Sequence, residues 1–292
     1  MKHYIQLLRP LQWLKNCFVF APIFFSNNLL NSDYFWPTLI VFVSFCLISS
    51  AIYCFNDIHD AEADRLHPKK KKRPIASGAV SVKAGYVLMA ICTLLSLAML
   101  CLVDSPNTPY LYIIIGGYWL MNIAYCLKLK RYAILDVTII AIGFVMRILI
   151  GGLAADIWIS HWLVLITFLV TLFLALSKRH DDFRIFEQTG VKPRDSITGY
   201  NITFINEATA IIASVTMVSY IMYTMSPEVI ERMGSHNLYL TSGWVLAGLL
   251  RYLQNMIVYG LSGSPTKSLV KDHFIQFCII GWIASFFAII YL

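Results

Sequence analysis

Nine apolar runs, each about 20 residues long, constrain the fold of this chain more than any other feature, because an α-helix of that length crosses the hydrocarbon of a bilayer. The runs are continuous and do not alternate with polar residues, which predicts helices rather than the strands of a membrane barrel. The predicted spans cover roughly residues 14–30, 36–55, 84–103, 110–127, 132–154, 159–177, 205–225, 238–260 and 274–292.

The composition agrees with a membrane protein. Hydrophobic residues make up 58% of the chain and charged residues 13%, and the mean hydropathy is +0.67. These values exclude an ordinary soluble globular domain. We therefore expect an all-α, polytopic membrane protein with one domain over residues 1–292, in which nine transmembrane helices surround a central cavity open to the cytoplasm.

The distribution of positive charge predicts the orientation. If the N-terminus is cytoplasmic, 20 of the 23 lysines and arginines lie on the cytoplasmic side, and the three others are Arg147, Arg232 and Arg251. This bias follows the positive-inside rule. The predicted outer connections are short and carry no cluster of chemically active side chains, so we expect function on the cytoplasmic side.

The most informative polar stretch, CFNDIHDAEADRLHPKKKKRPIASG, follows the second predicted span at residues 54–78. Asp57, Asp60 and Asp64 are spaced i, i+3 and i+7, so they share one face if the helix continues past the membrane surface. Asn56 adds a neutral oxygen. Hard oxygen ligands without histidine or thiolate suit Mg²⁺, which completes its shell with water and substrate phosphate. The alternative is a solvated loop in which acidic and basic residues neutralise each other.

The basic run after the aspartates divides into two parts. Lys69, Lys70 and Lys71 are interpreted as anchors to lipid headgroups, which cytoplasmic polybasic segments often provide. Lys72 and Arg73 directly precede Pro74, which stiffens the turn. These two residues are therefore the predicted phosphate contacts in this run.

A second charged segment, LSKRHDDFRIF at residues 176–186, is predicted as a cytoplasmic loop after the sixth span. Its placement mirrors the first and suggests a pseudo-repeated bundle with two halves. Lys178 and Arg179 make it more cationic, and Asp182 is a further candidate for substrate binding, whereas the role of Asp181 is left open. Other groups expected to converge on the same side are Lys15, Asn16, Tyr125, Lys128, Lys130 and Arg147.

Arg147 lies inside a predicted span, where an arginine normally faces a wet interior or a partner. The alternatives are that its side chain reaches the interface or pairs structurally with Asp136 on the same helix. Tyr125 could donate to a phosphate, although with 16 tyrosines in the chain its residue type favours interfacial packing.

The motif NDIHDAEAD, followed by KKKKRPIASGAVS, resembles the first signature of the UbiA superfamily of intramembrane prenyltransferases. The nine predicted helices fit the fold of that superfamily. The resemblance implies that Asn56, Asp57, Asp60 and Asp64 hold Mg²⁺ and, through the metal, a diphosphate. Of these, the three aspartates are the residues expected to be essential for catalysis.

The resemblance departs from typical members at the second motif. Those members carry a second Asp-rich motif after the sixth helix, where this chain has SKRHDD. With this altered motif, the chain resembles the phosphoribosyltransferase branch of the superfamily. Three further segments carry the same resemblance: LRPLQWLKNCFVFAP, MRILIGGLAA and GSPTKSLVKDHFIQ. The implied reaction transfers a 5-phosphoribosyl group from phosphoribosyl diphosphate to a polyprenyl phosphate, in a bacterial inner membrane.

The charges are compatible with that reaction, because two anionic substrates need more fixed cations than a prenyl diphosphate and a neutral aromatic acceptor do. One alternative is an ordinary prenyltransferase that acts on a quinone or haem precursor. A transporter is the other alternative, although transporters usually place their polar groups near the bilayer midplane. The expected partners are the two substrates and membrane lipids, without nucleic acid.

Overall fold

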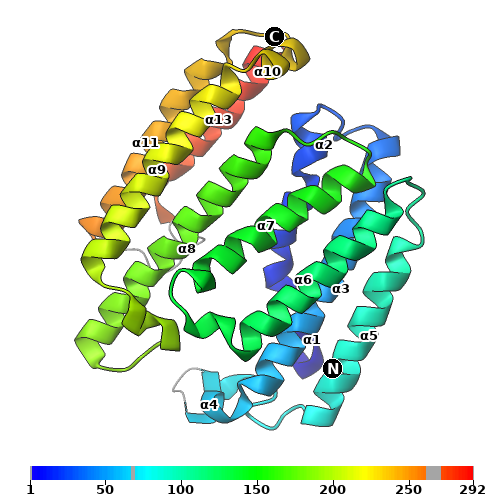
Figure 1. Cartoon of the computed structure of the whole chain (residues 1–292), viewed down its shortest axis with the longest axis vertical. Coiled ribbons are helices and arrows are strands. Elements are labelled where there is room, and N and C mark those ends of the chain that lie inside the picture. The colour runs from blue at the N-terminus through cyan, green and yellow to red at the C-terminus, as the bar shows by residue number, and fades with distance from the viewer. Residues whose placement is uncertain (1, 67–69, 261–270, 292) are drawn as a thin grey trace. The chain divides into compact units, whose positions relative to one another are not determined.

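The computed structural model describes residues 2–66, 70–260 and 271–291, and the elements within these ranges are helical. Six of the helices are long and apolar enough to cross a membrane. They are α3 (Ser32–His59), α5 (Val82–Leu100), α6 (Thr108–Leu127), α7 (Leu135–Ala154), α8 (His161–Thr189) and α9 (Ile202–Thr224), labelled in Figure 1. The all-α prediction is confirmed for the described residues.

The other three predicted spans have a different local structure. The first run is built from a 3₁₀-helix, η1 (Pro10–Phe20), and the short helix α2 (Ala21–Phe25), after an N-terminal helix α1 (Lys2–Leu8). The eighth run is η5 (Asn237–Thr241) followed by α11 (Ser242–Ile257), and the ninth is α13 (His273–Tyr291). Helical segments thus lie at all nine positions, and the membrane crossing of these three stays a prediction.

The described chain forms two compact units. Unit 1 comprises Met1–Lys130 and Gly143–Ile159, and unit 2 comprises Arg131–Ile142 and Ser160–Leu292, so α7 contributes to both. Whether they act as one domain over residues 1–292 stays a prediction.

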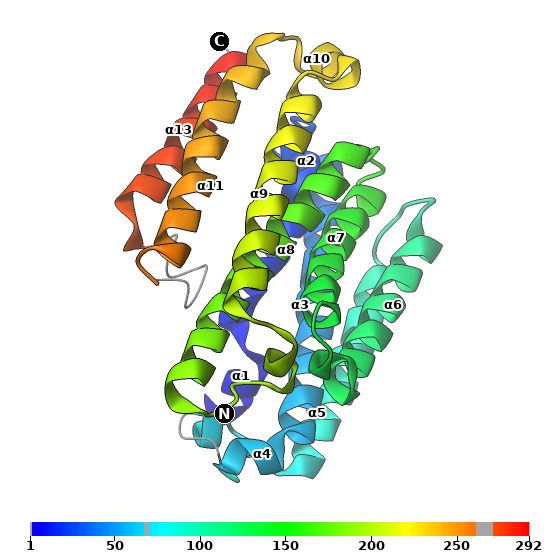
Figure 2. The same ribbon diagram turned by 60° about the vertical axis from the view of Figure 1, so that its left-hand side comes forward.

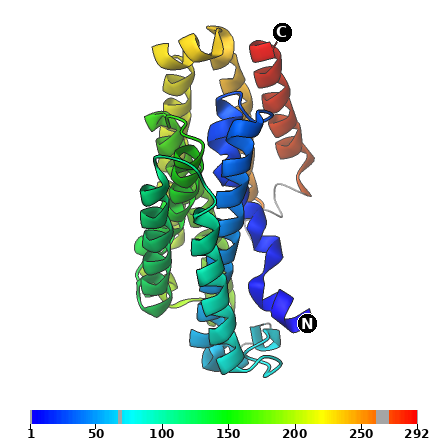
Figure 3. The same cartoon turned by 90° about the vertical axis from the view of Figure 1, so that its right-hand side faces the viewer.

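Helix α3 is the centre of unit 1 and packs along α5, as Figure 3 shows. The two helices approach closely at a pair of small polar residues: Ser44 Oγ donates to the carbonyl of Ser96 at 2.8 Å, and Ser96 Oγ donates to the carbonyl of Ser44 at 2.9 Å. Small residues allow such close packing between membrane helices. Apolar side chains from α3, α6 and α7, including Phe45, Ile115 and Ile150, form the adjoining core.

The N-terminal segment packs on the same unit and has an irregular backbone. Pro10 lies at the start of η1, and Arg9 before it has the left-handed conformation, with φ 52°. Further along, η1 lies against α7 at Gly151, where an added Cβ would be 1.9 Å from the carbonyl oxygen of Val19. Glycine is therefore required at position 151 for this close approach.

The acidic stretch is helical, but the continuous helix expected from its spacing is broken at Asp60. Helix α3 runs to His59, Asp60 follows it with non-helical geometry, and α4 (Ala61–Leu66) begins directly afterwards. The amide of Asp64 donates to the carbonyl of Asp60 at 2.8 Å and bridges the break. A short 3₁₀-turn, η2 (Lys70–Lys72), leads towards α5, whose N-cap is Ser81.

In unit 2, α8 and α9 pack together, and α11 packs against both α9 and α13 (Figure 2). Helix α8 continues through Thr189 and ends at Gly190, which has φ 68°. The prediction of a loop at residues 176–186 was therefore wrong, because charged residues ended the apolar run without breaking the helix. A short 3₁₀-turn, η4 (Asp195–Gly199), precedes α9, and α10 (Pro227–Met233) follows it.

Candidate functional site

The aspartates of the first motif are paired with basic residues from three segments of unit 1. Asp57, at the end of α3, accepts hydrogen bonds from Arg9 and, at 3.2 Å, from Arg73 Nη1. The same Nη1 donates to Asp64 of α4 at 2.6 Å. One guanidinium nitrogen therefore lies between two carboxylates that are seven residues apart in the sequence.

Asp60 is paired with a different basic residue. Lys130, just beyond the end of α6, donates to its Oδ1 at 2.6 Å. Asn56 lies one helical turn before Asp60, and its side-chain oxygen is 3.5 Å from the Sγ of Cys126. The structure thus brings the N-D-x-x-D-x-x-x-D residues, Arg73 and Lys130 into one region, and it adds Arg9, which the sequence reasoning missed.

The donor chemistry of this region fits Mg²⁺. Among the described residues, no three histidine, cysteine, aspartate or glutamate side chains are gathered closely enough to form a metal site. However, Asp57 and Asp64 both contact one nitrogen of Arg73, and Mg²⁺ commonly uses only one or two carboxylates. Metal binding by Asp57 and Asp64 stays a prediction, as do the roles of Asn56 and Asp60.

Four other predicted substrate-binding residues of unit 1 lie on η1, in η2 and at the end of α6. Lys72 is exposed in η2, Lys128 is exposed at the C-cap of α6, and Lys15 is exposed on η1. Tyr125 is half-buried in the last turns of α6. Their contact with substrate stays a prediction.

Arg147 belongs to a buried cluster inside unit 1. Its Nε donates to Asn16 Oδ1 at 2.8 Å, Nη1 to the carbonyl of Gly143 at 2.6 Å and Nη2 to the hydroxyl of Tyr118 at 3.0 Å. The guanidinium also lies 4.7 Å from the ring centroid of Phe45. Neutral oxygens and aromatic faces therefore satisfy the arginine, and they link α7 to η1 and α6.

Asp136, which was the alternative structural partner of Arg147, is bound to Arg179 in unit 2. Arg179 Nε donates to Asp136 Oδ2 at 2.8 Å, and its Nη1 donates to Asp182 at 2.9 Å. Asp182 also forms an ion pair with Arg194 at 2.8 Å. Only 1% of the Arg179 side chain is exposed, whereas Lys178 is exposed.

The same network holds the connection between α8 and α9. Ser196 Oγ donates to Asp136 Oδ2 at 2.8 Å, and the hydroxyl of Tyr200 donates to Oδ1 at 2.7 Å. Burial and the hydrogen bond to Asp136 raise the pKa of Tyr200, which keeps the hydroxyl protonated as a donor. Arg179 therefore has a structural role, and its predicted contact with a phosphate is untested.

The sequence carried partial signals for the residues that were missed. Arg9 stands in the basic N-terminal stretch before Pro10, but nothing in the sequence pairs it with Asp57, 48 residues away. Tyr118 is one of 16 tyrosines, so its residue type alone gave no reason to select it. Asp136 lies on the same predicted helix as Arg147 and was the alternative partner for that arginine, whereas the structure pairs it with Arg179.

Comparisons with known proteins agree on the family and fold. The model of the UbiA prenyltransferase family matches residues 18–260. The decaprenyl-phosphate phosphoribosyltransferase of Mycolicibacterium smegmatis is 33% identical over 98% of this chain and 92% of its own length. The protein of the same name from Corynebacterium glutamicum is 30% identical over 99% of this chain and 86% of its own length.

A solved structure shares the fold. The UbiA homologue from Archaeoglobus fulgidus, bound to GPP and Mg²⁺, superposes with a TM-score of 0.72 and 17% identity, covering 99% of this chain and all of that one.

Proposed function

Because this chain belongs to the UbiA prenyltransferase family, we propose that it transfers a 5-phosphoribosyl group from phosphoribosyl diphosphate to a polyprenyl phosphate and releases diphosphate. The observation that carries this proposal is the similarity, along nearly the whole chain, to two proteins named decaprenyl-phosphate phosphoribosyltransferase. The basic residues that surround the acidic motif support it, because both substrates are anionic.

The diphosphate of the donor is assigned to the first motif. Asp57 and Asp64, with Asn56 and Asp60 nearby, would hold Mg²⁺, which supplies charge neutralisation for the leaving diphosphate. Arg73 and Lys130 already lie at these carboxylates and can donate to diphosphate oxygens. Charge-assisted hydrogen bonds of this kind are among the stronger contacts that a protein makes to phosphate.

The remaining cations would bind the 5-phosphate of the donor and the phosphate of the lipid. In unit 1, Lys15, Lys72 and Lys128 are exposed and are proposed contacts for an approaching anion, as is Tyr125, while Arg147 and Asn16 would support η1 through their hydrogen bond. In unit 2, Lys178 is exposed and is a further proposed contact, while Arg179 and Asp182 would support its helix. As the bond between the anomeric carbon and diphosphate breaks, an oxygen of the lipid phosphate forms the new bond from the opposite face. The monoester is already anionic, so the attack needs no strong general base.

The proposed setting is a bacterial inner membrane with the N-terminus and the active site on the cytoplasmic side. In this arrangement nine helices surround a cavity that opens to the cytoplasm. The six candidate spans and the charge bias of the sequence support this topology.

Prenyl transfer to an aromatic acceptor is the second candidate, because the structural neighbour from A. fulgidus is bound to GPP and Mg²⁺. That reaction would favour a second acidic metal site around Asp181 and Asp182. In this chain Asp182 is instead paired with Arg179, whose side chain is 1% exposed and also binds Asp136, whereas the arginines at Asp57 are about a quarter exposed. A metal ion could displace Arg9 or Arg73 more easily than the buried Arg179, which favours the phosphoribosyl reaction.

The deciding experiment gives the purified protein two substrate pairs in the presence of Mg²⁺. One pair is radiolabelled phosphoribosyl diphosphate with a polyprenyl phosphate, and the other is a polyprenyl diphosphate with an aromatic acid. We expect label in the lipid fraction from the first pair alone. Product from the second pair alone would replace the proposal by aromatic prenyl transfer.

A further inference from the structure

The carboxylates of the first motif are covered by their own cations. The Asp57 side chain is 2% exposed, whereas the side chains of Arg9 and Arg73 that bind it are 25% and 27% exposed. Asp64 is similarly covered, with 4% of its side chain exposed. A metal ion that approaches Asp57 from the solvent must therefore displace at least one arginine.

The pairing also balances the charge of the cluster. Asp57, Asp60 and Asp64 contact Arg9, Arg73 and Lys130, so the formal charges cancel. Mg²⁺ alone would add two uncompensated positive charges and force guanidinium groups away from their carboxylates. Diphosphate alone would add several negative charges beside acidic side chains. The two ligands together compensate each other and give the released cations new partners.

Arg9 is held in place for such an exchange. Its backbone has φ 52° and ψ 59°, a left-handed conformation that non-glycine residues rarely adopt and that persists only when its surroundings impose it. The carbonyl of Leu8 accepts a hydrogen bond from Ser50 Oγ at 2.9 Å, and Trp13 Nε1 donates to the same Oγ at 3.0 Å. These contacts fasten the backbone before Arg9 and the side chain of Trp13 after it to α3.

The guanidinium of Arg9 also contacts an aromatic ring while it binds Asp57. Its guanidinium carbon is 4.7 Å from the ring centroid of Tyr53, one helical turn before Asp57. An arginine can keep a cation–π contact while its N–H groups change partners. Arg9 can therefore leave Asp57 without leaving the region.

We propose that Arg9 is a diphosphate-binding residue that occupies Asp57 until Mg²⁺ arrives, so that metal and diphosphate bind with positive coupling. Arg73 takes part in the same exchange, since its Nη1 lies between Asp57 and Asp64, where the metal would bind. This inference rests on the proposed function, because it takes Mg²⁺ and a diphosphate as the ligands. It adds a binding residue and an energetic link between the two ligands.

Equilibrium dialysis of the detergent-solubilised full-length protein tests the coupling without any catalytic readout. Mn²⁺ serves as the metal probe, and its excess in the protein chamber is measured with and without inorganic diphosphate. For the wild type we expect diphosphate to tighten Mn²⁺ binding about fivefold or more, within the usual range of coupling between sites. In Arg9→Gln, Mn²⁺ alone should bind more tightly than in the wild type, and the effect of diphosphate should shrink.

Arg65→Gln is the matched control, since it removes the same charge from α4, where Arg65 donates to the backbone carbonyl of Ala76. It should keep the coupling of the wild type. Arg9→Lys keeps the charge without the guanidinium and should give an intermediate coupling. If Arg9→Gln does not fold, the wild type, Arg9→Lys and Arg65→Gln still decide the question.

The outcomes separate this inference from the proposed function. Wild-type protein that binds Mn²⁺ equally well with and without diphosphate would overturn the coupling and leave the metal site standing. If the coupling is present but the Arg9 variants match the wild type, the assignment of Arg9 as the coupling residue fails and the metal site again stands. If the wild type binds no Mn²⁺ even with diphosphate, the proposed metal site fails and the inference fails with it.

Discussion

At the residue scale, the chemistry of the acidic motif depends on which carboxylates lie together. Arg73 joins Asp57 and Asp64, whereas Asp60 is held separately by Lys130. Glu62, on the same short helix as Asp64, is exposed. This difference between neighbouring acidic residues allows a sharp test of the metal site.

We expect Asp57→Asn and Asp64→Asn each to lower turnover by about a hundredfold or more, equivalent to about 2.8 kcal/mol of lost transition-state stabilisation. Each change removes a charged oxygen ligand and keeps the side-chain shape. The effect is measured as transfer of radiolabelled phosphoribosyl groups to lipid, with variants that elute normally from a sizing column. Glu62→Gln is the control, and its activity should remain close to that of the wild type. Near-normal activity in both aspartate variants, or full activity in EDTA, would contradict the assignment of the metal site.

Arg179 gives the second prediction at this scale. Replacing it by alanine leaves Asp136 and Asp182 without their buried partner, and breaking such a pair typically costs about 3–5 kcal/mol. Arg179→Ala should therefore lower the resistance of the detergent-solubilised protein to thermal unfolding. Lys178→Ala is the control, because it changes an exposed neighbour on α8. It should leave the thermal resistance unchanged.

An Arg179→Ala protein with wild-type thermal resistance but a raised KM for either substrate would argue against the structural role. It would instead support the contact with substrate phosphate that the sequence suggested.

At the element scale, the N-terminal segment is the part of unit 1 that deviates most from a regular span. It is tied to α3 through Ser50 and to α7 through the hydrogen bond between Asn16 and Arg147. A 3₁₀-helix has poorer hydrogen-bond geometry than an α-helix, so packing and side-chain contacts must hold η1 in place. Its position in turn determines where Arg9 and Lys15 lie.

Gly151→Ala tests this packing. The new methyl group would meet the carbonyl oxygen of Val19 at 1.9 Å, and the backbone of η1 must move to avoid it. Overpacking of this kind typically costs about 1–3 kcal/mol. We expect lower thermal resistance and lower activity, because Arg9 and Asn16 lie on the displaced segment.

Gly116→Ala, on α6, is the matched control, since nothing lies within 4 Å of the added methyl group. It should leave both measurements unchanged. Equal behaviour of the two variants would show that η1 does not need the close approach at Gly151.

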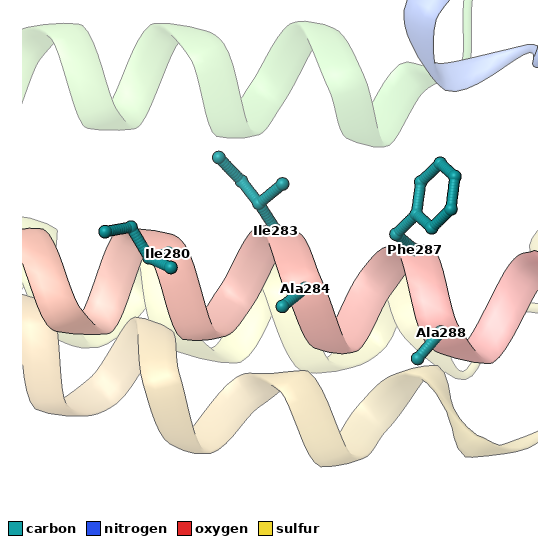
Figure 4. Close-up of a pocket in the computed structure, with 5 residues that line it drawn as sticks. All are labelled: Ile280, Ile283, Ala284, Phe287 and Ala288. Carbon is teal, nitrogen blue, oxygen red and sulfur yellow. The ribbon is translucent and has the colours of Figure 1, made fainter.

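Helix α13 carries a purely apolar feature. Ile280, Ile283, Ala284, Phe287 and Ala288 line a hollow of about 420 Å³ along one of its faces (Figure 4). An apolar surface is what a helix presents to lipid chains or to another helix in a membrane. This hollow contains none of the charged groups that the proposed reaction requires.

At the scale of the whole molecule, the charge bias predicts the topology. In a variant without the seven native cysteines, single cysteines at Lys71 and Lys192 should react with a membrane-impermeant maleimide only from the cytoplasmic side. Cysteines at Pro106 and His236 should react only from outside, because the positive-inside rule places these segments there. Intact cells and inverted vesicles provide the two measurements, and the reverse labelling would move the proposed site to the outer face.

The sequence by itself determined the helical class, the positions of the helical segments and the acidic motif. It could do so because a backbone in hydrocarbon must satisfy its own hydrogen bonds, so a continuous apolar run of about 20 residues has few other folds available. Local spacing likewise placed Asp57, Asp60 and Asp64 on neighbouring turns. It failed at residues 176–186, because polarity ends an apolar run but does not end a helix.

Only the tertiary structure decided the partners of the charged side chains. Arg9 and Asp57 are 48 residues apart, Lys130 and Asp60 are 70 apart, and Arg147 and Asn16 are 131 apart. A long basic side chain can reach any acceptor that the packing of helices brings near it, and local periodicity carries no information about that packing. The choice of Asp136 for Arg179 rather than Arg147 therefore came from three-dimensional proximity, since both arginines were available in the sequence.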